Sequence, residues 1–124
     1  MSNHWCWWQT PAGNNTALDD FEAMKAAYPD AYAKTKVTME RVTLGQARSG
    51  VSQLKGKLQE ISSQDGAIFL RVYFLKLAPH YVGVFVKAKK QNKADQKVVT
   101  RFEKLATRWN PVECQGAYPF ANVP

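Results

Sequence analysis

The sequence lacks several features that would assign it to a common class of protein. No window of its 124 residues approaches the roughly 20 consecutive apolar residues that cross a bilayer. The first ten residues have neither the basic start nor the aliphatic stretch of a signal peptide. No internal repeat or low-complexity segment is present, which excludes a repeat architecture. We therefore expect a soluble, cytoplasmic protein with one domain over 1–124 and tails at 1–4 and 110–124.

Cysteine is also scarce. The two cysteines, Cys6 and Cys114, lie near opposite ends of the chain, and their spacing matches no zinc or redox motif. We interpret them as reduced, mostly structural thiols, because disulfides are rare in cytosolic proteins. A disulfide that joins the two ends of the chain is the alternative.

The charge of the chain is unevenly distributed. Residues 1–54 carry equal numbers of acidic and basic side chains, so the whole formal net charge of +7 belongs to residues 55–124. A localised basic surface suggests a polyanionic partner such as nucleic acid. A solvated lysine face that serves only solubility is the competing interpretation.

The first half of the chain predicts a strand over 5–10 and then two helices. The turn at 11–14 precedes a helix capped by Asn15 or Thr16, and Pro29 ends that helix. Asp30 is the expected cap of a second helix that runs to about Leu44. The expected inward faces consist of Leu18, Phe21, Met24 and Tyr28 in the first helix and of Ala33, Val37 and Val42 in the second.

The second half predicts an antiparallel meander of strands over 57–61, 67–77 and 81–87, followed by a final helix. We expect Asn92 to cap that helix, with an inward face of Val98, Phe102, Leu105 and Trp109. These elements give an α+β fold in which a helical hairpin packs on a small, mainly antiparallel sheet. The three tryptophans of HWCWW are interpreted as core residues, with an RNA-stacking platform as the alternative.

Two basic features stand out in the meander. Arg71 lies between aromatic residues on one face of its strand, where it either pairs with Glu60 and packs on Phe69 or Tyr73, or has a functional role. Five lysines mark the junction between the last strand and the final helix, and they begin at Lys87. Ammonium groups beside a helix N-terminus favour phosphate binding. Lysines that protect a sheet edge from association are the alternative.

The run FLRVYFLKLAPHYVGVFVKAKKQNKADQKVVTRFEKLATRW carries a resemblance to a known family. With its Arg-Val pair, its Phe-Val-Lys-Ala-Lys-Lys segment and its closing helix, it resembles the C-terminal part of toxins in the HigB-like, phage-derived branch of the RelE/ParE superfamily. The order of elements in the first half is similar too, and the resemblance covers about residues 5–109.

The resemblance implies a RelE/ParE-like fold and a type II toxin. Such a toxin is an mRNA endoribonuclease that acts on or off the ribosome, inhibits translation and is held inactive by a cognate protein antitoxin. The chemistry would be attack of a ribose 2′-hydroxyl on the adjacent phosphate, with no metal and no cofactor. The catalytic residues that it implies are Arg71, Lys89, Lys93, Tyr73 and His80. The RNA-binding residues that we expect are Lys55, Lys57, Lys87, Lys90, Lys97 and Arg101.

The sequence departs from the family at two positions. Many members have Glu-Leu-Arg where this chain has Glu60-Ile61-Ser62, so one phosphate-binding arginine is missing. Asp95 stands where the family often has proline. Two further hypotheses follow: a protein inhibitor of DNA gyrase, as in the ParE branch, and a nucleic-acid-binding protein without catalysis.

Overall fold

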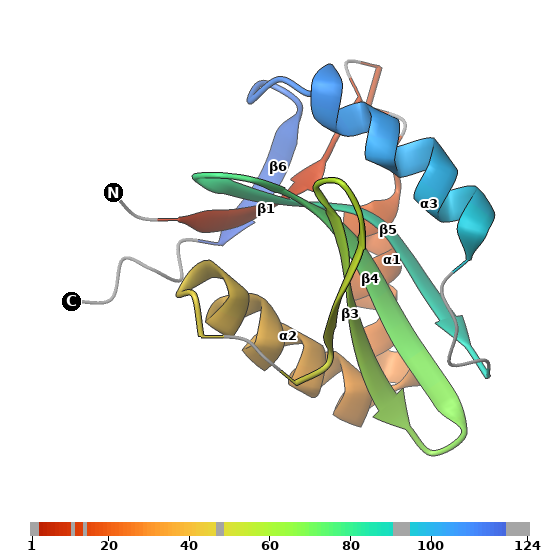
Figure 1. Ribbon diagram of the computed structural model, residues 1–124. Coiled ribbons are helices and arrows are strands. Elements are labelled where there is room, and N and C mark those ends of the chain that lie inside the picture. The colour runs from red at the N-terminus through yellow and green to blue at the C-terminus, as the bar shows by residue number, and fades with distance from the viewer. Residues whose placement is uncertain (1–2, 11, 14, 47–48, 91–94, 119–124) are drawn as a thin grey trace.

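The computed structural model describes residues 3–10, 12–13, 15–46, 49–90 and 95–118. Over these residues the fold is α+β, with three α-helices and a six-stranded, mostly antiparallel sheet (Figure 1). In the described part of the chain, no helix has the length and apolar content needed to span a membrane. The elements are β1 (His4–Trp8), α1 (Ala17–Ala27), α2 (Pro29–Thr43), β2 (Val51–Lys55), β3 (Leu58–Asp65), β4 (Ile68–Leu77), β5 (His80–Lys89), α3 (Gln96–Glu103), a 3-10 turn (Lys104–Thr107) and β6 (Cys114–Tyr118).

The sheet has the strand order β2-β3-β4-β5-β1-β6. The predicted antiparallel meander is confirmed as β3, β4 and β5. β1 runs parallel to β5 and separates it from β6, and all other neighbours are antiparallel. The sequence analysis missed two strands, β2 and β6, and both are edge strands of five residues. The expected C-terminal tail therefore contains part of the sheet.

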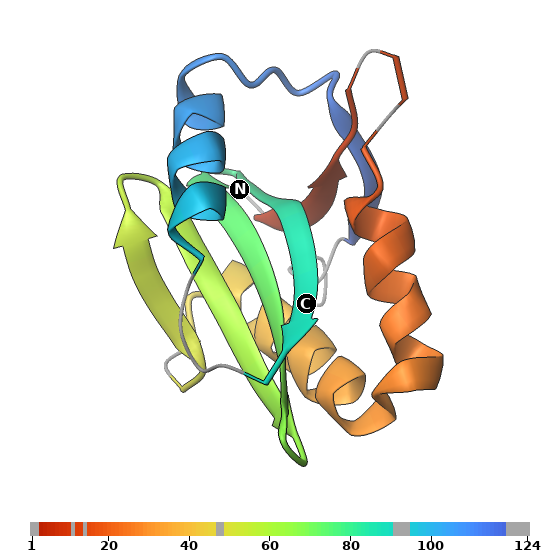
Figure 2. The same ribbon diagram turned by 90° about the vertical axis from the view of Figure 1, so that its right-hand side faces the viewer.

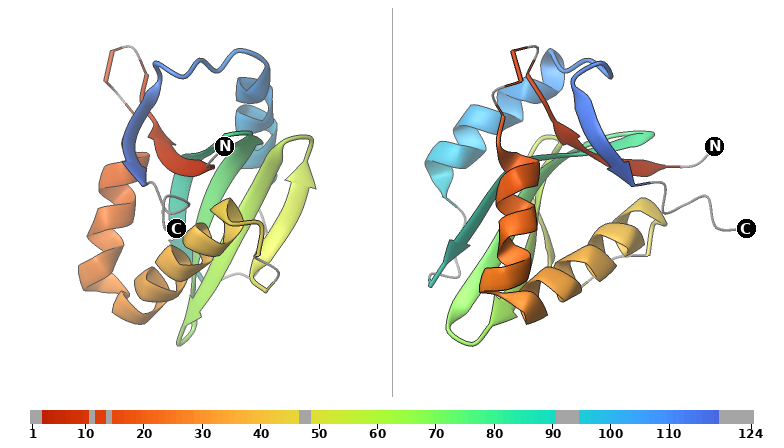
Figure 3. Two further views of the ribbon diagram at one scale, coloured as in Figure 1. Left: turned by 90° about the vertical axis from the view of Figure 1, so that its left-hand side faces the viewer. Right: turned by 180° about the vertical axis from the view of Figure 1, so that it is seen from behind.

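Helices cover both faces of the sheet (Figure 2). On one face, α1 and α2 bury Trp5, Trp7 and Phe74 (Figure 3). On the other face, α3 and the 3-10 turn pack over a second cluster that includes Trp8 and Tyr73. The core interpretation of HWCWW is therefore confirmed, with Trp8 facing away from Trp5 and Trp7.

The predicted inward face of α2 is wrong in part. Val37 is 50% exposed and Ala33 is exposed, whereas Val42 is buried as expected. The rotation of the helix is set by polar and aromatic contacts that an apolar pattern does not reveal. The Tyr32 ring stacks on Phe21 at 4.7 Å between centroids, and the Thr35 hydroxyl bonds to the Ser63 hydroxyl at 2.9 Å.

The predicted helix caps also need correction. Thr16 precedes α1 without a side-chain cap, and its hydroxyl bonds to Asp20 instead. Pro29 ends α1 and is itself the first residue of α2, a position that suits proline because its missing N–H has no partner there. Asp95 caps α3, since its carboxylate accepts the backbone N–H of Lys97. The expected cap, Asn92, lies outside the described residues.

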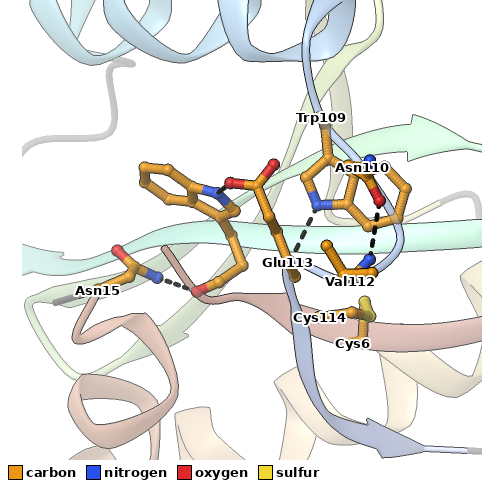
Figure 4. Close-up of a disulfide and its surroundings, with 8 residues drawn as sticks. Cys6, Asn15, Trp109, Asn110, Val112, Glu113 and Cys114 are labelled. Atoms are coloured by element: carbon orange, nitrogen blue, oxygen red, sulfur yellow. Dashed lines mark hydrogen bonds between the residues drawn. A yellow bond between two sulfur atoms is a disulfide. The ribbon is translucent and has the colours of Figure 1, made fainter. Parts of the chain in front are cut away.

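The interpretation of the cysteines as reduced thiols is wrong in this structure. Cys6 on β1 and Cys114 on β6 form a disulfide, with Cα atoms 5.6 Å apart (Figure 4). The pairing follows from the missed strand, because β6 lies antiparallel beside β1 and brings the two ends of the chain together. Disulfides persist mainly in oxidising compartments, so a cytoplasmic location stays a prediction.

Glu113 also links the segment after α3 to β1. Its carboxylate accepts the indole N–H of Trp8 at 3.4 Å, and its backbone carbonyl accepts the indole N–H of Trp109 at 3.1 Å (Figure 4). The side-chain amide of Asn15 donates to the backbone carbonyl of Trp8. The disulfide therefore sits beside a set of hydrogen bonds that hold the segment after α3 against β1.

We expect Cys114→Ser to lower the free energy of unfolding by about 4 kcal/mol, because the disulfide closes a loop with a sequence separation of 108. Urea unfolding followed by circular dichroism measures the change. Wild-type protein with reductant is the matched control, and it should unfold at the same urea concentration as the variant. Equal stability of oxidised and reduced wild type would contradict the prediction.

Candidate nucleic-acid interface

The candidate site lies on the α3 face of the sheet, where β5 ends and α3 begins. Cross-strand register places Arg71 on β4 opposite Lys87 on β5, and Phe69 opposite Lys89. The start of α3 lies close to Lys89, since Asp95 pairs with it at 3.3 Å, and the helix runs along one face of the sheet (Figure 2). We call Lys87, Lys89 and Asp95 the lysine cluster.

The lysine cluster is organised around one carboxylate. The Oδ2 atom of Asp95 lies 3.7 Å from the Lys87 ammonium nitrogen and 3.3 Å from that of Lys89. Its Oδ1 atom accepts the backbone N–H of Lys97 at 3.0 Å and so caps α3. Asp95 therefore occupies the anion position that the sequence analysis assigned to a phosphate, between ammonium groups and a helix N-terminus.

The contacts within the lysine cluster shift the pKa values of its three side chains. The adjacent Lys89 ammonium lowers the pKa of Lys87, while hydrogen bonding to Lys87 raises the pKa of Lys89. The hydrogen bond from the backbone N–H of Lys97 lowers the pKa of Asp95, and the Lys89 ammonium group also lowers it. Lys87 therefore gives up its proton more readily than an ordinary lysine, as proton transfer by this residue would require.

Arg71 is not at the surface of the site. It is 1% exposed and forms an ion pair with Glu60, with Nη1 and Oε2 2.6 Å apart. Its guanidinium also lies over the Phe69 ring, 6.0 Å from the ring centroid. The predicted pairing with Glu60 and packing on Phe69 are confirmed. In this structure a phosphate cannot reach the Arg71 guanidinium.

Tyr73 is also buried, with 1% of its surface exposed. Its hydroxyl accepts the backbone N–H of Asp95 at 3.2 Å, and burial raises its pKa. Tyr73 therefore fixes the start of α3 and stays protonated at neutral pH. Stacking on an RNA base is not open to it in this conformation.

The remaining predicted residues divide between the site and other places. Lys90 is exposed next to the cluster, and Lys93 lies outside the described residues. Lys97 and Arg101 lie on α3 beside Lys104, where they line a shallow hollow of about 470 Å³. Lys97 follows Asp95 of the cluster by two residues, so this hollow begins close to the cluster along the chain.

Three predicted residues lie toward the other end of the sheet. Lys55 pairs with Glu103 at 3.7 Å, and Lys57 is in the turn between β2 and β3. His80 begins β5, about 23 Å from Lys87 at roughly 3.3 Å per residue along the strand. Its pKa is lowered by burial and by the neighbouring His4. His80 is therefore separated from the lysine cluster.

The sequence analysis did not assign a site role to Asp95. A signal was present, because Asp, Asn, Ser or Thr directly before an apolar-periodic run is typical of a helix cap. Because Asn92 was the expected cap, the capping signal of Asp95 was not used. The ion pairs of Asp95 with two lysines on β5 follow from how α3 lies against the sheet, which the sequence does not reveal.

Comparisons with known proteins add no identification. No protein-family description matches the chain, and no curated protein matches it. Among the described residues, no three or more histidine, cysteine, aspartate or glutamate side chains are placed to hold a metal ion together.

We expect Arg71→Met to lower the free energy of unfolding by about 3–5 kcal/mol, because it leaves the Glu60 carboxylate buried and unpaired. The double variant Glu60→Leu, Arg71→Met should recover most of that loss. Lys76→Met, which removes an exposed cation from the same strand, is the control and should change stability by about 0.5 kcal/mol or less. Urea unfolding tests the set, and a double variant no more stable than Arg71→Met would refute the buried-pair assignment.

Proposed function

We propose that this chain binds RNA through its phosphate backbone, along the lysine cluster and the exposed face of α3. The observation that carries the proposal is that Lys87 and Lys89 both reach one oxygen of the Asp95 carboxylate, at the start of a helix. A carboxylate held by two ammonium groups and a helix N-terminus marks a place where an anion is stabilised. A phosphate of the RNA would compete with Asp95 for the same donors.

The surface next to the cluster supports a backbone track. Lys97, Arg101 and Lys104 border one hollow, and the i, i+4, i+7 spacing along the chain puts them on one side of the helix. Positive charge that follows a helix without a carboxylate in that hollow suits a polyanion. The concentration of net charge in residues 55–124 is consistent with this reading.

The family resemblance suggests a cellular role for this RNA binding. In that role the chain is a RelE/HigB-like toxin whose partners are mRNA, on or off the ribosome, and a protein antitoxin. The strand–helical hairpin–meander–helix order of the fold is in keeping with it. Burial of Arg71 and Tyr73, and the distant position of His80, weigh toward binding over cleavage.

A second candidate function, endoribonuclease activity, is favoured by one specific observation. The side chain of Lys89 lowers the pKa of Lys87, which is the direction that proton acceptance by a lysine requires. In this mechanism Lys87, in its neutral form, accepts the proton of a ribose 2′-hydroxyl. The 2′-oxygen attacks the adjacent phosphorus to form a 2′,3′-cyclic phosphate, and the departing 5′-oxygen takes a proton from water. Lys89 stabilises the charge that develops on the phosphate oxygens.

The competition with Asp95 predicts opposite effects for two substitutions. Asp95→Asn should tighten binding of single-stranded RNA, because it removes a negative charge while asparagine keeps the helix cap. Lys89→Gln should weaken binding and reduce the slope of log affinity against log salt by about 0.7. Fluorescence anisotropy of a labelled oligoribonucleotide over a salt series measures both.

Lys25→Gln is the matched control for charge, because Lys25 is exposed on α1, which covers the opposite face of the sheet. It should leave affinity and salt slope unchanged. If Asp95→Asn bound RNA no more tightly than wild type, Asp95 would not occupy a phosphate position. Equal losses in Lys25→Gln and Lys89→Gln would show a non-specific charge effect.

The cleavage mechanism predicts a particular pH dependence. The rate should rise with pH as Lys87 loses its proton, and Lys89→Gln should move this rise to higher pH, toward the ordinary lysine pKa of 10.5. An RNA oligonucleotide assayed for a 2′,3′-cyclic phosphate product gives the profile, with the 2′-deoxy analogue as the uncleavable control. Intact RNA at every pH would leave binding as the function.

A further inference from the structure

The chain has two histidines, and the fold places them side by side. His4 on β1 and His80 on β5 are direct partners in the parallel register. Their ring centroids lie 4.4 Å apart and their planes are inclined at 78°. Both side chains are partly exposed, so solvent reaches them. They begin β1 and β5, at the end of the sheet away from the lysine cluster.

The separation of the rings fits two cis ligands of one metal ion. A metal ion bound through one nitrogen of each ring lies about 3.2 Å from each centroid, given metal–nitrogen bonds of about 2.0–2.1 Å. Two such ligands at right angles place the centroids about 4.5 Å apart, whereas a tetrahedral angle places them about 5.2 Å apart. The observed 4.4 Å is close to the lower of these values, so both imidazoles lie near enough to reach one ion. Tetragonal coordination by nitrogen and oxygen is typical of Cu²⁺ and Ni²⁺.

The surroundings hold the two rings in place. The backbone N–H of His4 donates to the Pro79 carbonyl at 3.0 Å, which ties the start of β1 to the residue before His80. The Trp109 ring also packs against His80, with 5.0 Å between the ring centroids.

We propose that His4 and His80 form a two-imidazole site for a tetragonal divalent cation. Among the first-row divalent ions, Cu²⁺ should bind there most tightly. Water completes the coordination, since the described residues add no third histidine, cysteine, aspartate or glutamate. The order of divalent affinities for nitrogen sites puts Cu²⁺ above Ni²⁺ and Zn²⁺. The site is independent of RNA binding, because it lies at the other end of β5 from Lys87.

Copper at this site would bridge β1 and β5. Because the unfolded chain does not hold the two rings together, binding to the folded protein raises its thermal midpoint as copper is added. The bound ion also lies close to Trp109, whose ring contacts His80, so paramagnetic copper quenches the fluorescence of that indole.

The test is a titration of the full, disulfide-bonded chain with copper chloride at neutral pH. Electron paramagnetic resonance should show one copper coordinated by two imidazole nitrogens. His4→Gln and His80→Gln should each weaken copper binding at least tenfold and leave a single imidazole nitrogen. Lys87→Gln, at the other end of β5, is the matched control and should bind copper like wild type.

Thermal unfolding without copper establishes that each variant folds. Should His80→Gln fail to fold through loss of its contact with Trp109, His4→Gln supplies the same test. The titration is repeated on a chain with a short N-terminal extension, which removes the terminal amine as a ligand. Loss of binding in the extended chain, a single imidazole nitrogen in wild type, or unchanged affinity in His4→Gln would each overturn the proposal.

Discussion

Both faces of the central strands are buried, so a polar side chain on β4 needs a partner inside the protein. Arg71 is buried on β4, and Glu60 on the neighbouring strand supplies the compensating charge. Lys87 and Lys89, toward the end of β5, are partly exposed and pair with Asp95. The cations open to a ligand on this part of the sheet are therefore those of the lysine cluster, and Arg71 is not among them.

The sequence was sufficient for elements whose signal is local. The alternation of apolar residues along β4 predicted both of its faces, and the spacing from Val98 to Leu105 predicted the buried side of α3. Edge strands were missed because half-exposed residues in β2 and the irregular spacing of β6 give no clear period. The disulfide depends on the β1–β6 pairing, so it was missed as well.

The sequence predicted which types of residue the candidate site contains, but not how the fold places those residues relative to one another. Counting charges located the basic surface, and the Phe69–Arg71–Tyr73 pattern raised the buried pairing of Arg71 as an alternative. Whether that arginine faces solvent depends on the elements packed around β4, which sequence spacing cannot position. The separation of His80 from Lys87 likewise follows from strand length and register, which bring His80 beside His4 instead. Long-range contacts of this kind have no local signature.

The bond between Cys6 and Cys114 also decides how the molecule carries mechanical load. Tension applied to the two ends of the chain passes from one sulfur to the other and bypasses nearly the whole sheet, because the residues between them form a covalent ring. A single backbone cut inside that ring yields two fragments that stay attached until the bond is reduced. The oxidised protein therefore behaves as a closed loop with short ends.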